Sequence, residues 1–477
     1  MGTIEQSRVT GLPVQEMARR SPGAGVAAMQ NLAALRRGVM VPYQQQKGDE
    51  PKTYDQLVMA DRGGVIFEPL PGIFSNVAII DFVSMYPSII AKYNISPETV
   101  CTQEEDAWEI PDLGIKVSSH EGLIPAALRP LTEKRARIKK LLKTMQKNDK
   151  RYLQYKACSD GLKWLGVVSN GRLGFANAVF GRTNAHEALS FIARKMILRA
   201  KEIVEDHGFT VLHIYVDSLF ICKAGAVKES DFEFLLEEIE QETRLPIEVE
   251  AVYSWMAFLS SKQNPNLSVP NLFFGLQPSG EYKIRGLALR REDTPPFIAE
   301  AQAMALQILA EEKDANRLGQ LFPSILQLLQ ERCLALYSGK IPLRDLIATQ
   351  TLSRELHEYR VPSPAARAAG QLQALGKNIR MGQRIQFLHT KTKGGVTAWD
   401  LLDSQKPVLL DTAKYRELLF RAAHEVLQPL GVTKSVLKDW LYGNANYLVT
   451  PGLLHNRIEL PLFANLELMQ TEALSII

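Results

Sequence analysis

Apolar and polar positions along the chain predict a mixture of strands and helices. Two apolar segments, at 63–72 and 76–81, predict short strands separated by a Pro/Gly turn. Four consecutive apolar residues at 77–80 indicate that the second strand is buried on both faces. Asp81 closes this strand, and a carboxylate in such surroundings needs a partner.

A pair of antiparallel helices is expected after this strand. Apolar residues recur at helical spacing from Pro130 to about Asn170, interrupted by the polar stretch at 147–152. This stretch suits the turn between two helices, and the second of them is expected from about Tyr152 through Leu165.

The next segment predicts a long helix followed by a hairpin. Residues 184–207 are amphipathic, with Asn184 as a candidate N-cap and Gly208 as the stop. Residues 209–223 then indicate two strands that meet at a tight turn, with Asp217 at its tip.

The remaining segments are assigned more coarsely. Residues 44–56 are polar enough for a loop, 229–244 are helical, and 281–293 predict a basic strand. Beyond Pro295-Pro296 the pattern is mostly helical to about Leu336, and a mixed region follows. The C-terminal third is therefore expected to be a separate, largely helical subdomain.

Length and composition limit the class of protein. A chain of 477 residues exceeds one ordinary core, so about two to four domains or subdomains are expected. The 46% hydrophobic and 23% charged residues are typical of a soluble globular protein and favour neither a disordered nor a membrane class. No secretory signal is expected, and four scattered cysteines favour a reduced, cytoplasmic protein without structural zinc.

Positive charge is concentrated in one region, although the net charge is only +4. Residues 129–156 carry eleven cations against Glu133 and Asp149. Such a run on a helix is a candidate surface for a polyanion, while a solvated helical face is the commoner meaning of a charge run.

Two aspartates are candidates for chemistry because each sits at the end of an apolar strand. Asp81 and Asp217 are far apart in the chain, so only a fold can bring them together. Singly, each is more often a turn or capping residue. Together on adjacent strands they would suit Mg²⁺, which prefers one or two carboxylates plus phosphate oxygens. Two such ions can activate an attacking oxygen and stabilise a leaving one at phosphorus.

Phosphoryl transfer also needs cations that hold the triphosphate. Arg135 and Lys163, one on each expected helix of the pair, could supply them. Solvated surface charge is the alternative interpretation of both residues.

The string DFVSMYPSII at 81–90 resembles the first palm motif of family B DNA polymerases, Asp-Phe-x-Ser-Leu-Tyr-Pro-Ser-Ile-Ile, with Met85 as one conservative change. Further segments resemble archaeal-type members, so the similarity extends over nearly the entire chain. They are 7–23, 34–42, 93–100, 283–298 and 338–359.

This resemblance implies an α+β, right-hand polymerase with an antiparallel-sheet palm, two-helix fingers and a largely helical thumb. The expected divisions are an N-terminal segment and linker at 1–56, a first palm part at 57–124, fingers at 125–173, a second palm part at 174–268 and a thumb at 269–477.

The resemblance also implies roles for individual residues. Asp81 and Asp217 would bind two Mg²⁺ ions, for which Mn²⁺ is a substitute, with help from the carbonyl of Phe82. The remaining implied residues would bind the nucleotide. Ser84 and Met85 would meet the triphosphate through their backbone, Tyr86 would exclude a ribose 2′-hydroxyl, and Arg135 and Lys163 would grip phosphate.

Three departures from the family pattern are evident. Tyr215-Val216-Asp217-Ser218 stands where the family has Asp-Thr-Asp-Ser, so the first acid is missing. Val167 and Asn170 replace the fingers asparagine and tyrosine that pack against the incoming nucleotide, and a Lys-x-Arg-Tyr pattern is reduced to Asn271-Leu272-Phe273. A looser base-pair pocket predicts lower fidelity and greater tolerance of damaged templates.

The leading functional hypothesis is a template-directed DNA polymerase that adds dNTPs to a primer 3′ end. Only 80 residues precede Asp81, so no proofreading exonuclease is expected, as in the divergent, shortened branch of archaeal and bacterial family B enzymes. Arg285, Arg290 and Arg291 are expected to contact duplex phosphates.

Two other functions are compatible with the eroded motifs. One is a catalytically weak or inactive relative that acts as a DNA-binding accessory protein, and the other is a two-metal nuclease. The expected partners are primer–template DNA and dNTP, with no membrane, for a monomer associated with the nucleoid. A sliding clamp and accessory subunits are further candidate partners.

Overall fold

The structure is a computed structural model that describes residues 1–43, 53–54, 63–175, 177–261, 263–264, 267–402 and 407–441. The loop expected at 44–56 lies, apart from residues 53–54, outside the described residues. The chain forms two compact units. Unit 1 comprises 1–67, 79–221 and 229–250, and unit 2 comprises 68–78, 222–228 and 251–477.

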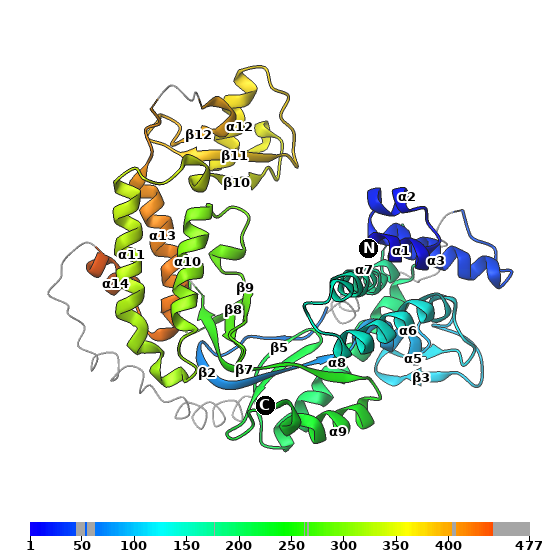
Figure 1. The fold of residues 1–477 in the computed structure, drawn as a ribbon. Coiled ribbons are helices and arrows are strands. Elements are labelled where there is room, and N and C mark those ends of the chain that lie inside the picture. Colours follow the sequence, from blue (N-terminus) through cyan, green and yellow to red (C-terminus); the bar gives the residue numbers. More distant parts are fainter. Residues whose placement is uncertain are drawn as a thin grey trace. The chain divides into compact units, whose positions relative to one another are not determined.

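A seven-stranded sheet has the strand order β1-β5-β6-β2-β7-β8-β9, and the printed pairings β1–β5, β7–β8 and β8–β9 are antiparallel (Figure 1). Strands β2 and β7 contribute residues to both units. The strands are β1 (Ile66–Phe67), β2 (Gly72–Phe82), β5 (Thr210–Tyr215), β6 (Ser218–Cys222), β7 (Ile247–Ser260), β8 (Ser268–Leu276) and β9 (Tyr282–Arg285).

Strand β2 is covered on both faces, as its apolar run predicted. Val77, Ala78, Ile79 and Ile80 are each fully buried. The strand is longer than expected and continues through Phe82. Asp81 is therefore the second-last residue of the strand and does not end it. Its carboxylate is therefore held by a regular, buried backbone.

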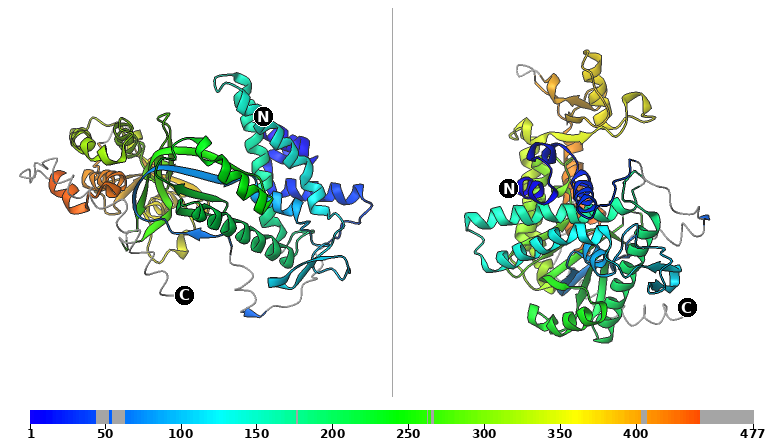
Figure 2. Two further views of the ribbon diagram at one scale, coloured as in Figure 1. Left: turned by 90° about the horizontal axis from the view of Figure 1, so that it is seen from below. Right: turned by 90° about the vertical axis from the view of Figure 1, so that its right-hand side faces the viewer.

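The expected helix pair is confirmed as α6 (Leu123–Thr144) and α7 (Lys150–Leu173), which pack against each other as a helical hairpin (Figure 2). Helix α6 begins before Pro130, which lies within it. Helix α7 begins where the Asp149 side chain accepts a hydrogen bond from the backbone N–H of Arg151, a typical N-cap.

Three helices at the N-terminus, α1 (Gly2–Thr10), α2 (Val14–Arg19) and α3 (Pro22–Arg36), were not anticipated from the sequence. Helices α1 and α3 pack on α7. The Gly2 backbone oxygen lies 3.0 Å from the position that a Cβ on Gly161 would occupy, so the two helices meet at their backbones. Buried Glu5 of α1 forms an ion pair with Lys134 of α6.

The amphipathic helix expected at 184–207 is α8 (Thr183–Asp206), but its N-cap is Arg182 and not Asn184. The helix begins at Thr183, so Asn184 lies inside its first turn, where Nδ2 donates to Sγ of Cys101 at 3.2 Å. Gly208 follows the helix at a φ of 72°, as expected of a stop residue.

Shorter elements complete unit 1. The helix expected at 229–244 is confirmed as η2 (Glu229–Phe232) followed by α9 (Glu233–Thr243). The others are α5 (Met85–Lys92), β3 (Trp108–Ile110), η1 (Pro111–Leu113) and β4 (Ile115–Val117). In the part of the chain that the structure describes, no helix is long and apolar enough to cross a bilayer.

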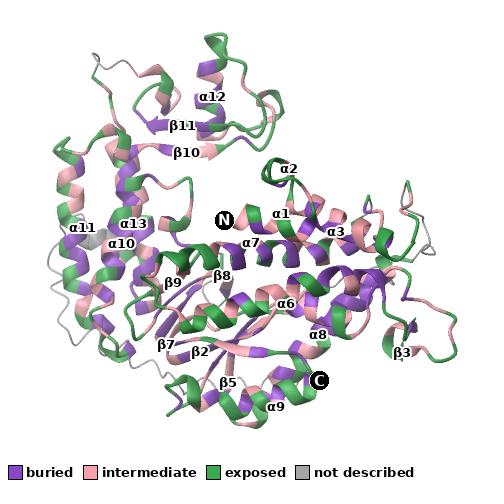
Figure 3. Cartoon of the chain, turned by 45° about the vertical axis from the view of Figure 1, so that its right-hand side comes forward, coloured by how far each residue is buried: buried purple, intermediate pink, exposed green. Residues whose placement is uncertain are grey.

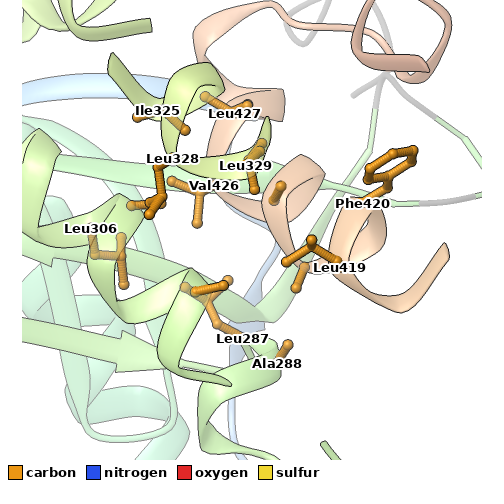
Figure 4. Close-up of a cluster of buried hydrophobic side chains, with 14 of the residues drawn as sticks. Leu287, Ala288, Leu306, Ile325, Leu328, Leu329, Leu419, Phe420, Val426 and Leu427 are labelled. Atoms are coloured by element: carbon orange, nitrogen blue, oxygen red, sulfur yellow. The ribbon is translucent and has the colours of Figure 1, made fainter. Parts of the chain in front are cut away.

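Unit 2 contains a helical core, in line with the pattern beyond residue 295. Helices α10 (Pro296–Leu309), α11 (Phe322–Tyr337) and α13 (Thr412–Leu427) pack on one another around buried side chains (Figures 3 and 4). Figure 3 shows that buried positions line one face of α11 and exposed positions the other. The remaining helix is α14 (Lys434–Leu441).

The expectation of a largely helical C-terminal third needs one correction, because a second sheet lies within it. Strands β10 (Ala348–Thr351), β11 (Arg384–His389) and β12 (Val396–Ala398) pair antiparallel and form a separate small core with α12 (Pro364–Ala374). The short 3₁₀ helices are η3 (Ala288–Arg290), η4 (Ala315–Leu321), η5 (Leu343–Leu346), η6 (Leu356–Glu358), η7 (Trp399–Leu401) and η8 (Gln428–Leu430).

The basic strand expected at 281–293 is shorter than predicted. Strand β9 ends at Arg285 because Gly286 turns the chain at a φ of 70°, and η3 follows. A Cβ on Gly286 would lie 2.4 Å from the carbonyl oxygen of Asn271, so only glycine fits this turn.

Candidate active site

The two aspartates chosen from the sequence meet at the ends of neighbouring strands. Strand β6 lies beside β2 in the sheet, and the N–H of Phe82 donates to the carbonyl oxygen of Asp217 at 3.0 Å. The hydroxyl of Ser218 donates to Oδ1 of Asp81 at 2.6 Å. Both aspartates line one pocket in unit 1.

The turn that presents Asp217 has an unusual backbone. Val216 has a φ of 61°, in the left-handed region that a β-branched residue rarely adopts. Its N–H donates to the carbonyl of Val65 at 2.9 Å, and the N–H of Asp217 donates to the carbonyl of Tyr215 at 2.8 Å. Such strain costs on the order of 1–3 kcal/mol and clusters at functional sites.

The carboxyl of Asp81 has a pKa raised from 3.8 to about 7. Burial is the main cause, and the nearby charges of Asp217 and Glu250 raise it further. The hydrogen bond from Ser218 and the charge of Lys163 act in the opposite direction. Two acids are therefore held together although their charges repel.

This donor set fits a hard divalent cation. Carboxylate oxygens are the ligands that Mg²⁺ prefers, and one or two of them suffice when substrate phosphates complete the coordination. The raised pKa of Asp81 indicates that the protein groups alone do not fully compensate the negative charges of Asp81 and Asp217. Among the residues that the structure describes, no group of three or more His, Cys, Asp or Glu side chains could hold a metal.

The turn after β2 positions a cation next to the acids. Ser84 adopts a left-handed conformation with a φ of 53° and occupies the N-cap position of α5. The Arg135 guanidinium, from α6, donates through Nη1 to the Ser84 hydroxyl. Burial lowers the pKa of Arg135, while the charges of Glu248, Asp160 and Asp81 raise it. A cation that is partly desolvated in this way interacts strongly with an anion that enters the pocket.

Helix α7 supplies the facing wall of the pocket. Lys163, Gly166, Val167 and Asn170 all line it and follow one another at helical spacing. Gly166 faces α5, since a Cβ there would lie in ordinary van der Waals contact with Cγ of Pro87, at 3.4 Å.

Tyr86, in the first turn of α5, also lines the pocket. Burial raises the pKa of its phenol, and the charge of Asp217 raises it further, while Arg194 lowers it. The ring is therefore a neutral wall at ordinary pH, close enough to Asp217 to sense its charge.

Two polar residues of the pocket were not singled out from the sequence. Lys139 follows Arg135 by one turn of α6, lines the pocket, and forms an ion pair with Glu248. Thr132 lies one turn before Arg135. The cation run at 129–156 contained Lys139, but spacing alone did not separate it from its solvated neighbours.

The structure places the three arginines expected at duplex DNA in unit 2, on or beside β9 and η3. Arg291 donates through Nη2 to Oε1 of buried Glu425 at 2.7 Å. The N–H of Ala288 donates to the other carboxylate oxygen at 2.9 Å. Arg291 thus also fixes the chain around η3.

Two carboxylates opposite two cations in one pocket, on a sheet flanked by helices, are typical of enzymes that transfer phosphoryl groups with divalent cations. The profile of DNA polymerase family B matches residues 29–429. The chain belongs to this family.

Individual relatives agree with this assignment. A DNA polymerase 2 of Saccharolobus solfataricus is 31% identical over 300 residues, which cover 62% of this chain and 43% of the relative. A DNA polymerase of Archaeoglobus fulgidus is 28% identical over 396 residues, which cover 82% and 47%. The chain thus spans about half the length of the curated relatives it matches.

A solved structure supports the fold. The family B DNA polymerase from the hyperthermophilic archaeon Pyrobaculum calidifontis is similar with a TM-score of 0.64 and 26% identity, over 91% of this chain and 54% of that one. The α+β fold class expected from the sequence is confirmed.

Proposed function

We propose that this protein is a DNA-directed DNA polymerase that adds dNTPs to the 3′ end of a primer. The observation that carries the proposal is that Asp81 and Asp217 share one pocket with Arg135 and Lys163. Family membership supports the same reaction.

Each pocket residue has a role in this proposal. Asp81 and Asp217, with the carbonyl of Phe82, would hold two Mg²⁺ ions. Bound there, the ions supply Lewis acidity toward the attacking and leaving oxygens. In the overall reaction the primer 3′-oxygen bonds to the α-phosphorus of the dNTP, and pyrophosphate leaves.

The remaining residues would bind and select the nucleotide. Arg135 and Lys163 would offset the negative charge of the triphosphate, and Ser84 and Met85, which line the same pocket, would meet it through their backbone. Tyr86 would press against the sugar and leave no room for a 2′-hydroxyl.

Fidelity forms a finer part of the proposal. Asn170 presents a smaller side chain to the pocket than the tyrosine that the family pattern leads one to expect, and Val167 presents an apolar side chain in place of the asparagine. We infer low fidelity and tolerance of damaged templates. Extension across an abasic site, compared with an undamaged base, tests this inference.

Primer extension tests the main proposal. Purified protein should extend a labelled primer with Mg²⁺ or Mn²⁺, and Asp217→Asn should lower the rate at least about 10³-fold while DNA affinity is kept. Exposed Asp112→Asn, whose partner is Lys195, is the matched control and should extend normally.

Two outcomes favour other functions. The missing first acid at Tyr215 motivates the alternative of an accessory DNA-binding protein. Binding of primer–template without extension by either metal would establish it. Degradation of the labelled primer without dNTPs, lost in Asp217→Asn, would instead indicate a nuclease.

A further inference from the structure

An exposed tryptophan lies beside the pocket without lining it. Trp164 of α7 is 61% exposed. Tryptophan is usually well buried, because its large ring gains much by leaving water. Lys163, next to it in the chain, and Val167, one turn further on, both line the pocket, so Trp164 lies on α7 beside the residues of the pocket wall.

The other sides of α7 are covered. The side with Gly161 and Leu165 faces α1 and α3, since a Cβ on Gly161 would meet Gly2 and a Cβ on Gly25 would meet Leu165. The side with Lys163 and Gly166 lines the pocket. Trp164 belongs to the open sector between them.

Space next to the ring is open as well. Val167, one turn after Trp164, is 53% exposed, and nothing lies within 4 Å of a Cβ built on Gly171 a further turn on. A planar group could therefore lie on this part of α7 without meeting a side chain at Gly171.

The charge of the surrounding helices favours a polyanion over a protein. Residues 129–172 contain thirteen lysines and arginines against three acids, Glu133, Asp149 and Asp160. An aromatic ring on a cationic surface is the combination by which proteins hold single-stranded nucleic acid, through stacking and phosphate contacts.

We propose that Trp164 is a stacking platform for an unpaired base of the template strand. This inference rests on the proposed function. A templating base must meet the incoming nucleotide in the pocket that Lys163 and Val167 line, and the next template base is still unpaired. Its face is free for a ring, whereas duplex bases already stack on one another.

DNA binding without dNTP or metal tests the proposal. Fluorescence anisotropy would compare a labelled primer–template that has a single-stranded 5′ template overhang with a blunt duplex of the same paired length, at one salt concentration. Trp164→Ala should weaken overhang binding about 5- to 50-fold and leave blunt-duplex binding unchanged.

Two variants make the result specific. Trp164→Phe keeps a π-face and should retain most of the overhang affinity. Leu153→Ala removes an apolar side chain that is 67% exposed on the same helix and should change neither affinity. An equal loss on both DNAs, or no loss with Trp164→Ala, overturns the proposal.

The proposal and the polymerase function can fail separately. If the wild type extends primers but Trp164→Ala binds the overhang normally, the stacking site is wrong and the polymerase function stands. If the wild type extends no primer, yet Trp164→Ala selectively loses overhang binding, the polymerase function is wrong and the stacking site stands.

Discussion

The hydroxyl of Ser218 donates a 2.6 Å hydrogen bond to Oδ1 of Asp81 and thereby links β6 to β2. This bond favours the ionised form of a carboxyl whose pKa is otherwise raised by burial and by Asp217. A small hydroxyl thus helps keep the site ready to bind a cation near neutral pH.

Ser218→Ala should therefore raise the pKa of Asp81 above about 7. In a pH profile of kcat/KM for primer extension, the acidic limb should move to higher pH. Ser338→Ala, which removes a hydroxyl bonded only to the backbone of α11, serves as the control. If the acidic limb of the profile stays at the same pH in Ser218→Ala, a group other than Asp81 determines it.

The raised pKa of Asp81 also predicts how stability depends on pH without metal. Because folding raises this pKa from 3.8 to about 7, its stabilising contribution is complete below pH 3.8 and is lost as the pH rises through 7. The loss amounts to at most about 4 kcal/mol, since one pKa unit is about 1.4 kcal/mol.

Asp81→Asn should remove this dependence of the unfolding free energy on pH and should stabilise the metal-free protein at pH 8. Urea unfolding between pH 5 and 8 measures it, and Mg²⁺ should stabilise the wild type but not the variant. If the unfolding free energy of the variant depends on pH as strongly as that of the wild type, the dependence does not come from Asp81.

Arg135→Ala should raise the KM for dNTP at least about tenfold, because a partly desolvated cation beside Ser84 would be lost. Arg137→Ala is the matched control on the same helix, since Arg137 is exposed and pairs with Glu133. Steady-state kinetics with one correct dNTP provides the measurement. Equal effects of both substitutions would point to general loss of positive charge.

Val216→Asn should stabilise the protein by about 0.5–1 kcal/mol. Asparagine tolerates the left-handed conformation that Val216 adopts at a φ of 61°. Val211→Asn, in the regular part of β5, should destabilise it. Urea unfolding compares the two, and a destabilised Val216→Asn would mean that packing of Val216 against the Gly64 turn outweighs the strain.

Tyr86→Ala should admit ribonucleotides. The substitution opens the pocket next to the position proposed for the sugar, so the preference for dNTP over rNTP should fall at least about tenfold. Tyr93→Ala, on the residue that caps the other end of α5, should leave the preference unchanged. Single-nucleotide insertion with matched dNTP and rNTP gives the ratio.

Periodicity predicted the helix pair and α8, because each of these helices has one face against a core and one against water. The β5–β6 hairpin was predicted from two apolar runs around a turn, and both strands are buried at consecutive positions. Periodicity missed α1–α3, whose alanine- and arginine-rich sequence shows little contrast between faces. The sheet inside unit 2 was missed for a related reason: its strands are as short as β12, at Val396–Ala398.

For the site, the sequence selected residues that the structure brings to one pocket, but it did not predict their surroundings. Asp81 and Asp217 could be chosen because each ends an expected apolar strand, where an isolated buried carboxylate is costly. Their surroundings include the hydrogen bond from Ser218 to Asp81 and the one from Arg135 to Ser84. Each of these bonds joins segments more than 50 positions apart. No local pattern records such contacts.

The backbone contact between Gly2 and Gly161 constrains how this protein can change over time. Each position already lacks a side chain, so a substitution at one cannot be compensated by a smaller residue at the other. Either change must push α1 away from α7 and, with it, disturb the helix that carries Lys163. We therefore expect both glycines to be replaced rarely among close homologues, although neither touches the pocket.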